Sequence, residues 1–191
     1  DRPDRIDTVY RVPVSASEYF LLENRNRDWA RNGQRVTISY NGTISQRSYQ
    51  RDTVGFNAFS LTDIRGNILD VEDFDWSLPG GVGSQTNEFF DGGILIWHID
   101  ESVIAVGIAA NGVNANPRRR GVDLEEADGS QDIGQQYGQL EPGSGSEEGT
   151  VFDFWFQGNI APVYRNEFSA TSYPNNAGNS GANSHFAIKE F

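Results

Sequence analysis

The sequence predicts a mainly β fold: an antiparallel, β-sandwich-like single domain with long loops and one or two short helices. First, short apolar or alternating stretches are separated by turns rich in Gly, Asn and Pro. Second, the 21 glycines favour many turns over long helices. Third, 191 residues with 37% hydrophobic and 12% aromatic side chains suffice for one domain with an aromatic core.

Residues 94–99 are the predicted central strand. They form a dense apolar run between glycines on one side and acids on the other, which is typical of a buried strand. Asp100 is the expected N-cap of a short helix that extends to about Ala110, and the valines and isoleucines that follow give this helix an apolar side.

Two further strands are expected near the N-terminus. Residues 8–14 alternate, and Pro13 indicates a strand end or a sheet edge. Residues 18–25 are apolar on both faces at their centre, which predicts a strand covered on both sides. This strand ends in Glu23 and Arg25, whose charges we expect to pair.

A β-hairpin is the clearest local prediction. Residues 35–40 and 43–50 both alternate and contain β-forming side chains, and Asn41-Gly42 between them favours a type I′ turn. The outward side chains are polar, so the hairpin is expected to project into water.

The remaining expected strands are shorter or less regular. They comprise 53–61, 67–71, a strand within 121–129 that runs into an acidic turn, an aromatic strand or edge segment at 151–156, and a last strand within 184–191. Residues 133–150 are rich in Gly, Gln, Ser and Glu, which is typical of a flexible surface loop.

Composition and charge restrict the classes of function. The formal net charge of −12 argues against nucleic-acid or anionic-membrane binding. The absence of Cys excludes disulfides, thiolate metal sites and a Cys nucleophile. No run of about 18 apolar residues occurs, so no membrane span is expected. The chain contains no Met and opens at Asp1, so we expect a fragment or a processed product.

Calcium ligands are predicted in the acidic turn after the strand within 121–129. Alternation places Val122, Leu124, Glu126 and Asp128 on one side, so that Glu126 lies at the core boundary. A carboxylate there needs a metal or a cationic side chain. Asp128 and Asp132 bound a compact oxygen-rich turn that does not match the EF-hand pattern.

A second candidate site comprises Asp73 and Asp75, whose carboxylates are two residues apart on one side of an extended segment. A solvated acidic loop is the alternative interpretation. The predicted calcium ligands are therefore Glu126, Asp128, Asp132, Asp73 and Asp75.

No catalytic residue is predicted. The sequence contains no His-Glu-x-x-His zinc-protease helix, no Gly-x-Ser-x-Gly elbow and no phosphate loop. His98 lies inside the central strand and is interpreted as a satisfied core or interface residue, whereas His185 has no neighbouring motif. The basic cluster 118–120 is expected to pair with nearby acids or to lie over an interface.

Several blocks of sequence occur in a characteristic order. They are Glu-Tyr-Phe-Leu-Leu-Glu-Asn-Arg at 18–25, Leu-Pro-Gly at 78–80, Gly-Ile-Leu-Ile-Trp-His-Ile-Asp-Glu at 93–101, Gly-Val-Asp-Leu-Glu-Glu-Ala-Asp-Gly at 121–129, and Ser-Tyr-Pro-Asn at 172–175 followed by 181–188. Together they resemble the region that follows the catalytic domain in M6-family (immune inhibitor A-like) secreted metallopeptidases, over roughly residues 9–190 with gaps.

The resemblance implies a non-catalytic segment of a secreted zinc peptidase, or of a relative that lost the activity. The family's zinc is held by a His-Glu-x-x-His helix upstream of these blocks, so zinc is expected only in an upstream domain. The family commonly binds calcium and is secreted, which implies an extracellular or cell-surface location. Residues 26–75, with the projecting hairpin, depart from the family's spacing and are interpreted as an insertion.

Three functional hypotheses follow. The first is an accessory domain that packs on an upstream catalytic domain and is stabilised by calcium. The second is an extracellular structural or interaction module, a cell-surface or filament subunit, that contacts another protein or self-associates through 35–50 and 151–156. The third is a glycan-binding module with exposed Trp and Tyr side chains, although core packing explains most of these aromatics better.

Overall fold

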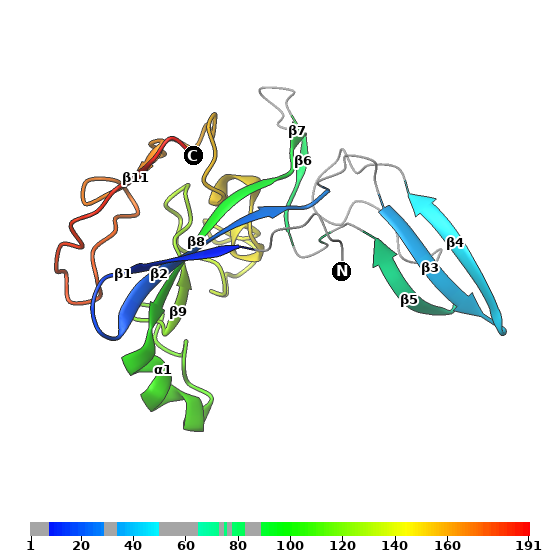
Figure 1. Ribbon diagram of the computed structural model, residues 1–191, viewed down its shortest axis with the longest axis horizontal. Coiled ribbons are helices and arrows are strands. Elements are labelled where there is room, and N and C mark those ends of the chain that lie inside the picture. The colour runs from blue at the N-terminus through cyan, green and yellow to red at the C-terminus, as the bar shows by residue number, and fades with distance from the viewer. Residues whose placement is uncertain (1–7, 29–33, 50–64, 73–74, 76–77, 83–88) are drawn as a thin grey trace. The chain divides into compact units, whose positions relative to one another are not determined.

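The computed structural model describes residues 8–28, 34–49, 65–72, 75, 78–82 and 89–191. The chain forms two compact units, which are described separately (Figure 1). Unit 1 comprises Asp1–Arg25 and Gly93–Phe191, and unit 2 comprises Asn26–Gly92. The predicted mainly β class with antiparallel sheets is confirmed. Among the described residues, no helix is long and apolar enough to cross a membrane.

The principal sheet of unit 1 has the strand order β1-β2-β8-β9 within the described chain. The strands are β1 (Val9–Pro13), β2 (Glu18–Asn26), β8 (Gly92–Asp100) and β9 (Val122–Leu124). The β1–β2 and β8–β9 pairings are antiparallel. The predicted central strand is thus an interior strand, and unit 2 is the chain segment that connects β2 to its neighbour β8.

An aromatic core covers one face of this sheet. Phe20 from β2 and Ile96 from β8 are fully buried, and Trp155 and Phe168 pack against them. The Phe20 and Phe168 rings meet edge to face with centroids 5.1 Å apart. Such pairs contribute about 0.5–1.5 kcal/mol beyond the burial of their area.

The second layer of this core is mostly irregular chain. Its regular part is the antiparallel pair β10 (Glu167–Phe168) and β11 (Ile188–Lys189). The predicted last strand is therefore present, although short.

One predicted strand is largely wrong. Within 151–156, Val151–Asp153 form a 3-10 helix, η4, and only Trp155 pairs, in a single bridge to Ile94. The reason is a capping box, in which the Thr150 side chain accepts the Phe152 N–H and Asp153 accepts the Thr150 N–H. This local cap overrides the β propensity of the aromatic side chains.

The predicted helix and its cap are confirmed. Helix α1 (Glu101–Gly107) continues into a 3-10 turn, η2 (Ile108–Ala110), and Asp100 accepts the first free N–H groups at the N-terminus. The helical segment ends at Asn111, which adopts a left-handed conformation with φ of 51°. Residues 133–150 contain a further 3-10 turn, η3 (Ser146–Glu148).

Unit 2 contains the predicted hairpin. Its strands β3 (Gln34–Tyr40) and β4 (Thr43–Tyr49) join β5 (Asn67–Glu72) in the order β4-β3-β5. Asn41 and Gly42 have φ of 49° and 77°, the positive values that a type I′ turn requires.

The three-stranded sheet buries one row of apolar side chains and exposes another set. Val36 and Ile38 are buried, whereas Ile44, Leu69, Tyr40 and Ile68 are 44–65% exposed.

A second pair, β6 (Gly81–Val82) and β7 (Phe89–Phe90), completes the described strands of unit 2. The predicted strand at 53–61 lies outside the described residues. Unit 2 begins at the same residue as the expected insertion 26–75 and extends to Gly92.

Candidate metal centre

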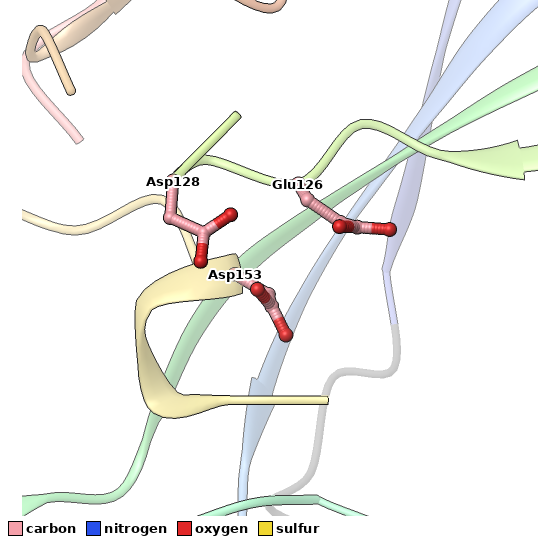
Figure 2. A group of neighbouring side chains, drawn as sticks. All are labelled: Glu126, Asp128 and Asp153. Atoms are coloured by element: carbon pink, nitrogen blue, oxygen red, sulfur yellow. The ribbon is translucent and has the colours of Figure 1, made fainter. Parts of the chain in front are cut away.

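Three carboxylates of unit 1 lie together after β9 and in η4. Glu126, Asp128 and Asp153 each offer an oxygen, and these oxygens all lie within 4.8 Å of one another (Figure 2). We call them the acidic triad. Glu126 and Asp128 belong to a tight turn that Gly129 closes, with φ of 79° and an N–H that donates to the Glu126 carbonyl.

Glu126 is fully buried, and its hydrogen-bond partners in the described part of the chain are all neutral. Its Oε1 accepts the Ile133 N–H at 2.9 Å, and its Oε2 accepts the Asp132 N–H at 2.9 Å and the Ser130 hydroxyl at 2.6 Å. Burial raises the pKa of Glu126, these hydrogen bonds lower it, and the net pKa is raised. The hydrogen bonds therefore offset only part of the free-energy cost of burying the Glu126 carboxylate.

Among the three carboxyl groups of the triad, burial and neighbouring charges disfavour the charged form of Asp153 most strongly. It is 3% exposed and accepts hydrogen bonds from the Thr150 backbone and hydroxyl. Burial raises its pKa, the Thr150 backbone bond opposes this, and the charges of Asp128 and Glu126 add to the rise, to a pKa of about 8. Its charged form is thus disfavoured at neutral pH unless a cation is added.

The other two carboxylates of this region have similar neutral partners. Half-buried Asp128 accepts the Ser130 N–H at 2.9 Å, and the Ser130 hydroxyl lies 2.6 Å from both Asp128 Oδ1 and Glu126 Oε2, so that its single proton serves only one of them at a time. Asp132 is 4% exposed; its Oδ2 accepts the Ser146 hydroxyl, while its buried Oδ1 has no hydrogen-bond partner among the residues that the structure describes. A buried oxygen without a partner is rare and costly.

Among the described residues, none of these four carboxylates forms an ion pair, whereas Glu18 and Glu125 lie beside His98, and Asp100 pairs with Arg119. Calcium takes six to eight oxygen ligands in flexible geometry, at about 2.3–2.6 Å. Carboxylate oxygens of the acidic triad could therefore hold a metal such as calcium.

The sequence predicted this site in part. Glu126 and Asp128 belong to the triad, whereas Asp132 contacts Glu126 through its backbone and its carboxylate lies outside the group. Asp153 was missed because it stands in an aromatic run, although Thr150 three residues earlier matches a capping pattern. Asp75 lies in unit 2, half-buried, and Asp73 lies outside the described residues.

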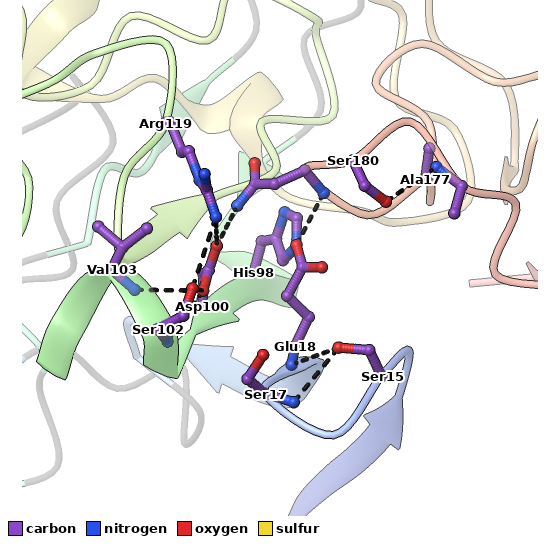
Figure 3. A network of polar contacts seen from close by, with 12 residues as sticks. Ser15, Ser17, Glu18, His98, Asp100, Ser102, Val103, Arg119, Ala177 and Ser180 are labelled. Carbon is purple, nitrogen blue, oxygen red and sulfur yellow. Dashed lines mark hydrogen bonds and ion pairs between the residues drawn. The ribbon is translucent and has the colours of Figure 1, made fainter. Parts of the chain in front are cut away.

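A second group of buried charges surrounds His98 (Figure 3). His98 Nε2 lies 3.3 Å from Glu18 Oε1, and Nδ1 lies 3.3 Å from Glu125 Oε1. The Phe20 ring packs beside the imidazole at a centroid distance of 4.6 Å. Burial lowers the pKa of His98, but the hydrogen bond and charge of Glu125 and the charge of Glu18 raise it above its usual value. The expected core histidine is thus buried between two carboxylates that favour its protonated form.

Asp100 extends this group. Its Oδ1 accepts the N–H groups of Ser102 and Val103 at 3.0 and 3.2 Å. Its Oδ2 accepts Arg119 at 3.1 Å and the Asn179 side chain at 2.9 Å. Burial alone would raise the pKa of Asp100, but the hydrogen bonds together hold it well below its usual range.

Asn179 connects Asp100 to Glu18, because its side chain donates to Asp100 and its backbone N–H donates to Glu18 Oε1 at 2.7 Å. We call Glu18, His98, Asp100, Arg119, Glu125 and Asn179 the His98 network. Three ion pairs match the predicted charge pairing: Arg119 and Arg120 each pair with a nearby acid, and Arg25 lies 3.6 Å from Glu23.

The chain matches no protein-family model, and it shows no significant similarity to a curated protein or to a solved structure. The likeness to the M6 metallopeptidase region therefore stays a hypothesis that rests on the sequence blocks, and the function must be argued from the site.

Proposed function

We propose that this chain is a supporting extracellular module whose fold is stabilised by a calcium ion bound at the acidic triad. As the sequence blocks suggest, it would act as a non-catalytic accessory domain of an M6-like secreted zinc metallopeptidase. One observation carries the calcium part: Glu126 and Asp153 are buried against each other and against Asp128, with neutral donors as their only described partners.

The physical argument is one of charge balance. Moving a carboxylate out of water costs several kcal/mol unless a cation compensates it. Protonation is one solution, and the raised pKa values of Glu126 and Asp153 point to it. A divalent cation is the other solution, and it allows the carboxylates to stay charged at neutral pH. An ion that binds only the folded state then adds its binding free energy to stability.

The test is a thermal melt of the full chain at pH 7.5 in a chelator and in rising calcium, with binding measured by calorimetry. At calcium concentrations of about 100 times Kd, we expect a stabilisation of about 2.7 kcal/mol. Asp153→Asn should abolish this gain. Glu148→Gln removes the same charge from an exposed side chain outside the triad and should leave the gain intact. An identical melting temperature in chelator and in calcium would contradict the calcium part of the proposal.

The accessory role needs a separate test. The reading frame upstream of the codon for Asp1 should encode a His-Glu-x-x-His helix if the chain supports a zinc peptidase. An upstream frame without zinc ligands would remove this part of the proposal while leaving the calcium site untouched.

A second candidate function, an interaction module, is favoured by the apolar side chains that unit 2 exposes. Ile44 is 65% exposed and Leu69 is 55% exposed, and β4 and β5 are the outer strands of their sheet within the described residues. Outer strands with exposed apolar side chains are sites of pairing with other chains. Sedimentation velocity across a concentration series should then show self-association that Ile44→Thr weakens and Ser48→Thr does not. A monomer at every concentration would contradict self-association.

A further inference from the structure

A hollow in unit 1 opens beside β9, and no carboxylate of the acidic triad and no residue of the His98 network lines it. Its volume is about 460 Å³, within the range of about 300–1,000 Å³ for small-molecule sites. Strands β8 and β9 provide Trp97, Val122 and Leu124, and two loops complete the wall at 114–120 and 133–136. Trp97 and Leu124 are direct partners across the β8–β9 pair, so the floor is a rigid piece of sheet.

Trp97 lines this pocket, and its only polar side-chain atom, the indole nitrogen, is hydrogen-bonded to another strand. The indole N–H donates to Glu23 Oε1 on β2 at 2.9 Å, and Arg25 lies 3.6 Å from the other Glu23 oxygen. This bond fixes the orientation of the indole before any ligand arrives. A rigid aromatic surface binds at a low cost in conformational entropy.

The polar part of the lining combines donors and acceptors with no net charge. Arg120 Nη1 donates to Asp123 Oδ1 at 2.7 Å, which leaves other guanidinium N–H groups and the second Asp123 oxygen for a ligand. Gln136 is exposed and adds an amide that both donates and accepts. The pocket thus presents paired donors and acceptors beside an apolar ring.

We propose that this pocket binds a neutral saccharide. A sugar ring has an apolar C–H face that can lie on an indole, whose face carries the negative part of its quadrupole. Its neighbouring hydroxyls both donate and accept, and so they match the guanidinium, carboxylate and amide groups. A purely apolar ligand would leave these polar groups buried without partners. The net charge of −12 and the neutral Arg120–Asp123 pair both disfavour an anionic ligand.

The experiment titrates the full chain, in calcium, with methyl glycosides of neutral hexoses and with the disaccharides cellobiose and maltose, followed by saturation-transfer NMR and calorimetry. We expect at least one neutral sugar to bind with Kd of about 1 mM. Trp97→Ala should weaken that binding at least about tenfold, and Gln136→Ala about threefold, since one uncharged hydrogen bond is worth about 0.5–1.5 kcal/mol. Gln139→Ala is the matched control: it removes an exposed amide from the same loop outside the pocket.

Three results would overturn the proposal: no neutral sugar binds, a hexuronate binds as well as the neutral sugars, or Gln136→Ala and Gln139→Ala behave alike. If Trp97→Ala fails to fold, Gln136→Ala and Asp123→Asn still test the pocket without changing its floor. Asp123→Asn keeps the shape but alters the acceptor and the charge balance, so it should also weaken neutral-sugar binding.

Discussion

The His98 network and the acidic triad bury carboxylates in the same compact unit, but they balance the charge differently. In the network, Glu18 and Glu125 flank an imidazole, and Asp100 accepts from Arg119. In the triad, the described partners are backbone N–H groups and hydroxyls. The network therefore includes Arg119 and an imidazole whose pKa is raised, although burial still raises the pKa of Glu125, whereas the described partners of the triad are all neutral.

The pKa values express this difference. In the network, the pKa of Asp100 falls because five hydrogen bonds, one of them from Arg119, favour its charged form. In the triad, the pKa of Asp153 rises to about 8 because burial and two neighbouring carboxylates oppose the charge. Burial raises the pKa of both residues; the hydrogen bonds outweigh it at Asp100, whereas those from Thr150 do not outweigh it at Asp153.

The largest expected effect is a loss of stability with rising pH in calcium-free protein. The pKa of Asp153 rises from 3.8 to about 8 on folding, so the folded state holds a proton that the unfolded state releases. Stability from this group is thus full below about pH 4 and is lost as the pH approaches 8. Urea unfolding in a chelator should show a fall of about 4 kcal/mol between pH 4 and pH 8.

Asp153→Asn should flatten this profile because the amide has no proton to lose. Glu148→Gln has the same net charge but leaves the triad intact, so it should keep the slope. Calcium should flatten the wild-type profile by stabilising the charged form. Equal slopes for the two variants would show that general repulsion in an acidic chain, rather than the triad, controls stability.

A smaller loss of stability is expected when Asp100, the acid of the His98 network whose charge is best compensated, is removed. Asp100→Ala removes the N-cap of α1, worth about 0.5–2 kcal/mol, and the charge-assisted bond to Arg119, worth about 1.5–3 kcal/mol. Arg119 is 54% exposed and can return to water, so we expect a net loss of about 3 kcal/mol in urea unfolding. Calcium should not change this loss. A loss that calcium restores would mean that the two groups are coupled.

How much of this was predictable from the sequence depends on the range of the interaction. The strands around 20 and 96, the hairpin turn at Asn41-Gly42 and the cap at Asp100 all follow from local periodicity or turn chemistry. The burial of Glu126 was expected from alternation along a strand, but β9 ends at Leu124, and Glu125, Glu126 and Ala127 are all buried in the irregular segment that follows.

Long-range partners were not predictable. His98 meets Glu18 and Glu125 only because β8 lies between β2 and β9, and Glu125 directly follows β9. No local pattern specifies that strand order. Asp153 joins the triad through a 3-10 turn inside an aromatic run, where β propensity points to a strand and a capping box determines the structure.

The smallest expected effect is the pH dependence of stability that is due to His98, which differs from the pH dependence due to Asp153. The pKa of His98 is raised in the folded state, so its contribution is full below its unfolded pKa of 6.5 and is lost as the pH rises through the folded value. His98→Gln should therefore destabilise the protein by about 1 kcal/mol at pH 6 and by less at pH 9, in calcium throughout.

His185→Gln is the control, since it removes an exposed histidine. The two buried clusters then differ in a measurable way: calcium should remove the pH dependence due to Asp153 and leave that due to His98, because only the triad lacks an internal cation. A His98→Gln loss that is constant from pH 6 to pH 9 would mean that the imidazole acts by packing on Phe20 rather than by its charge. The network would then resemble the triad in needing its counter-charge from outside.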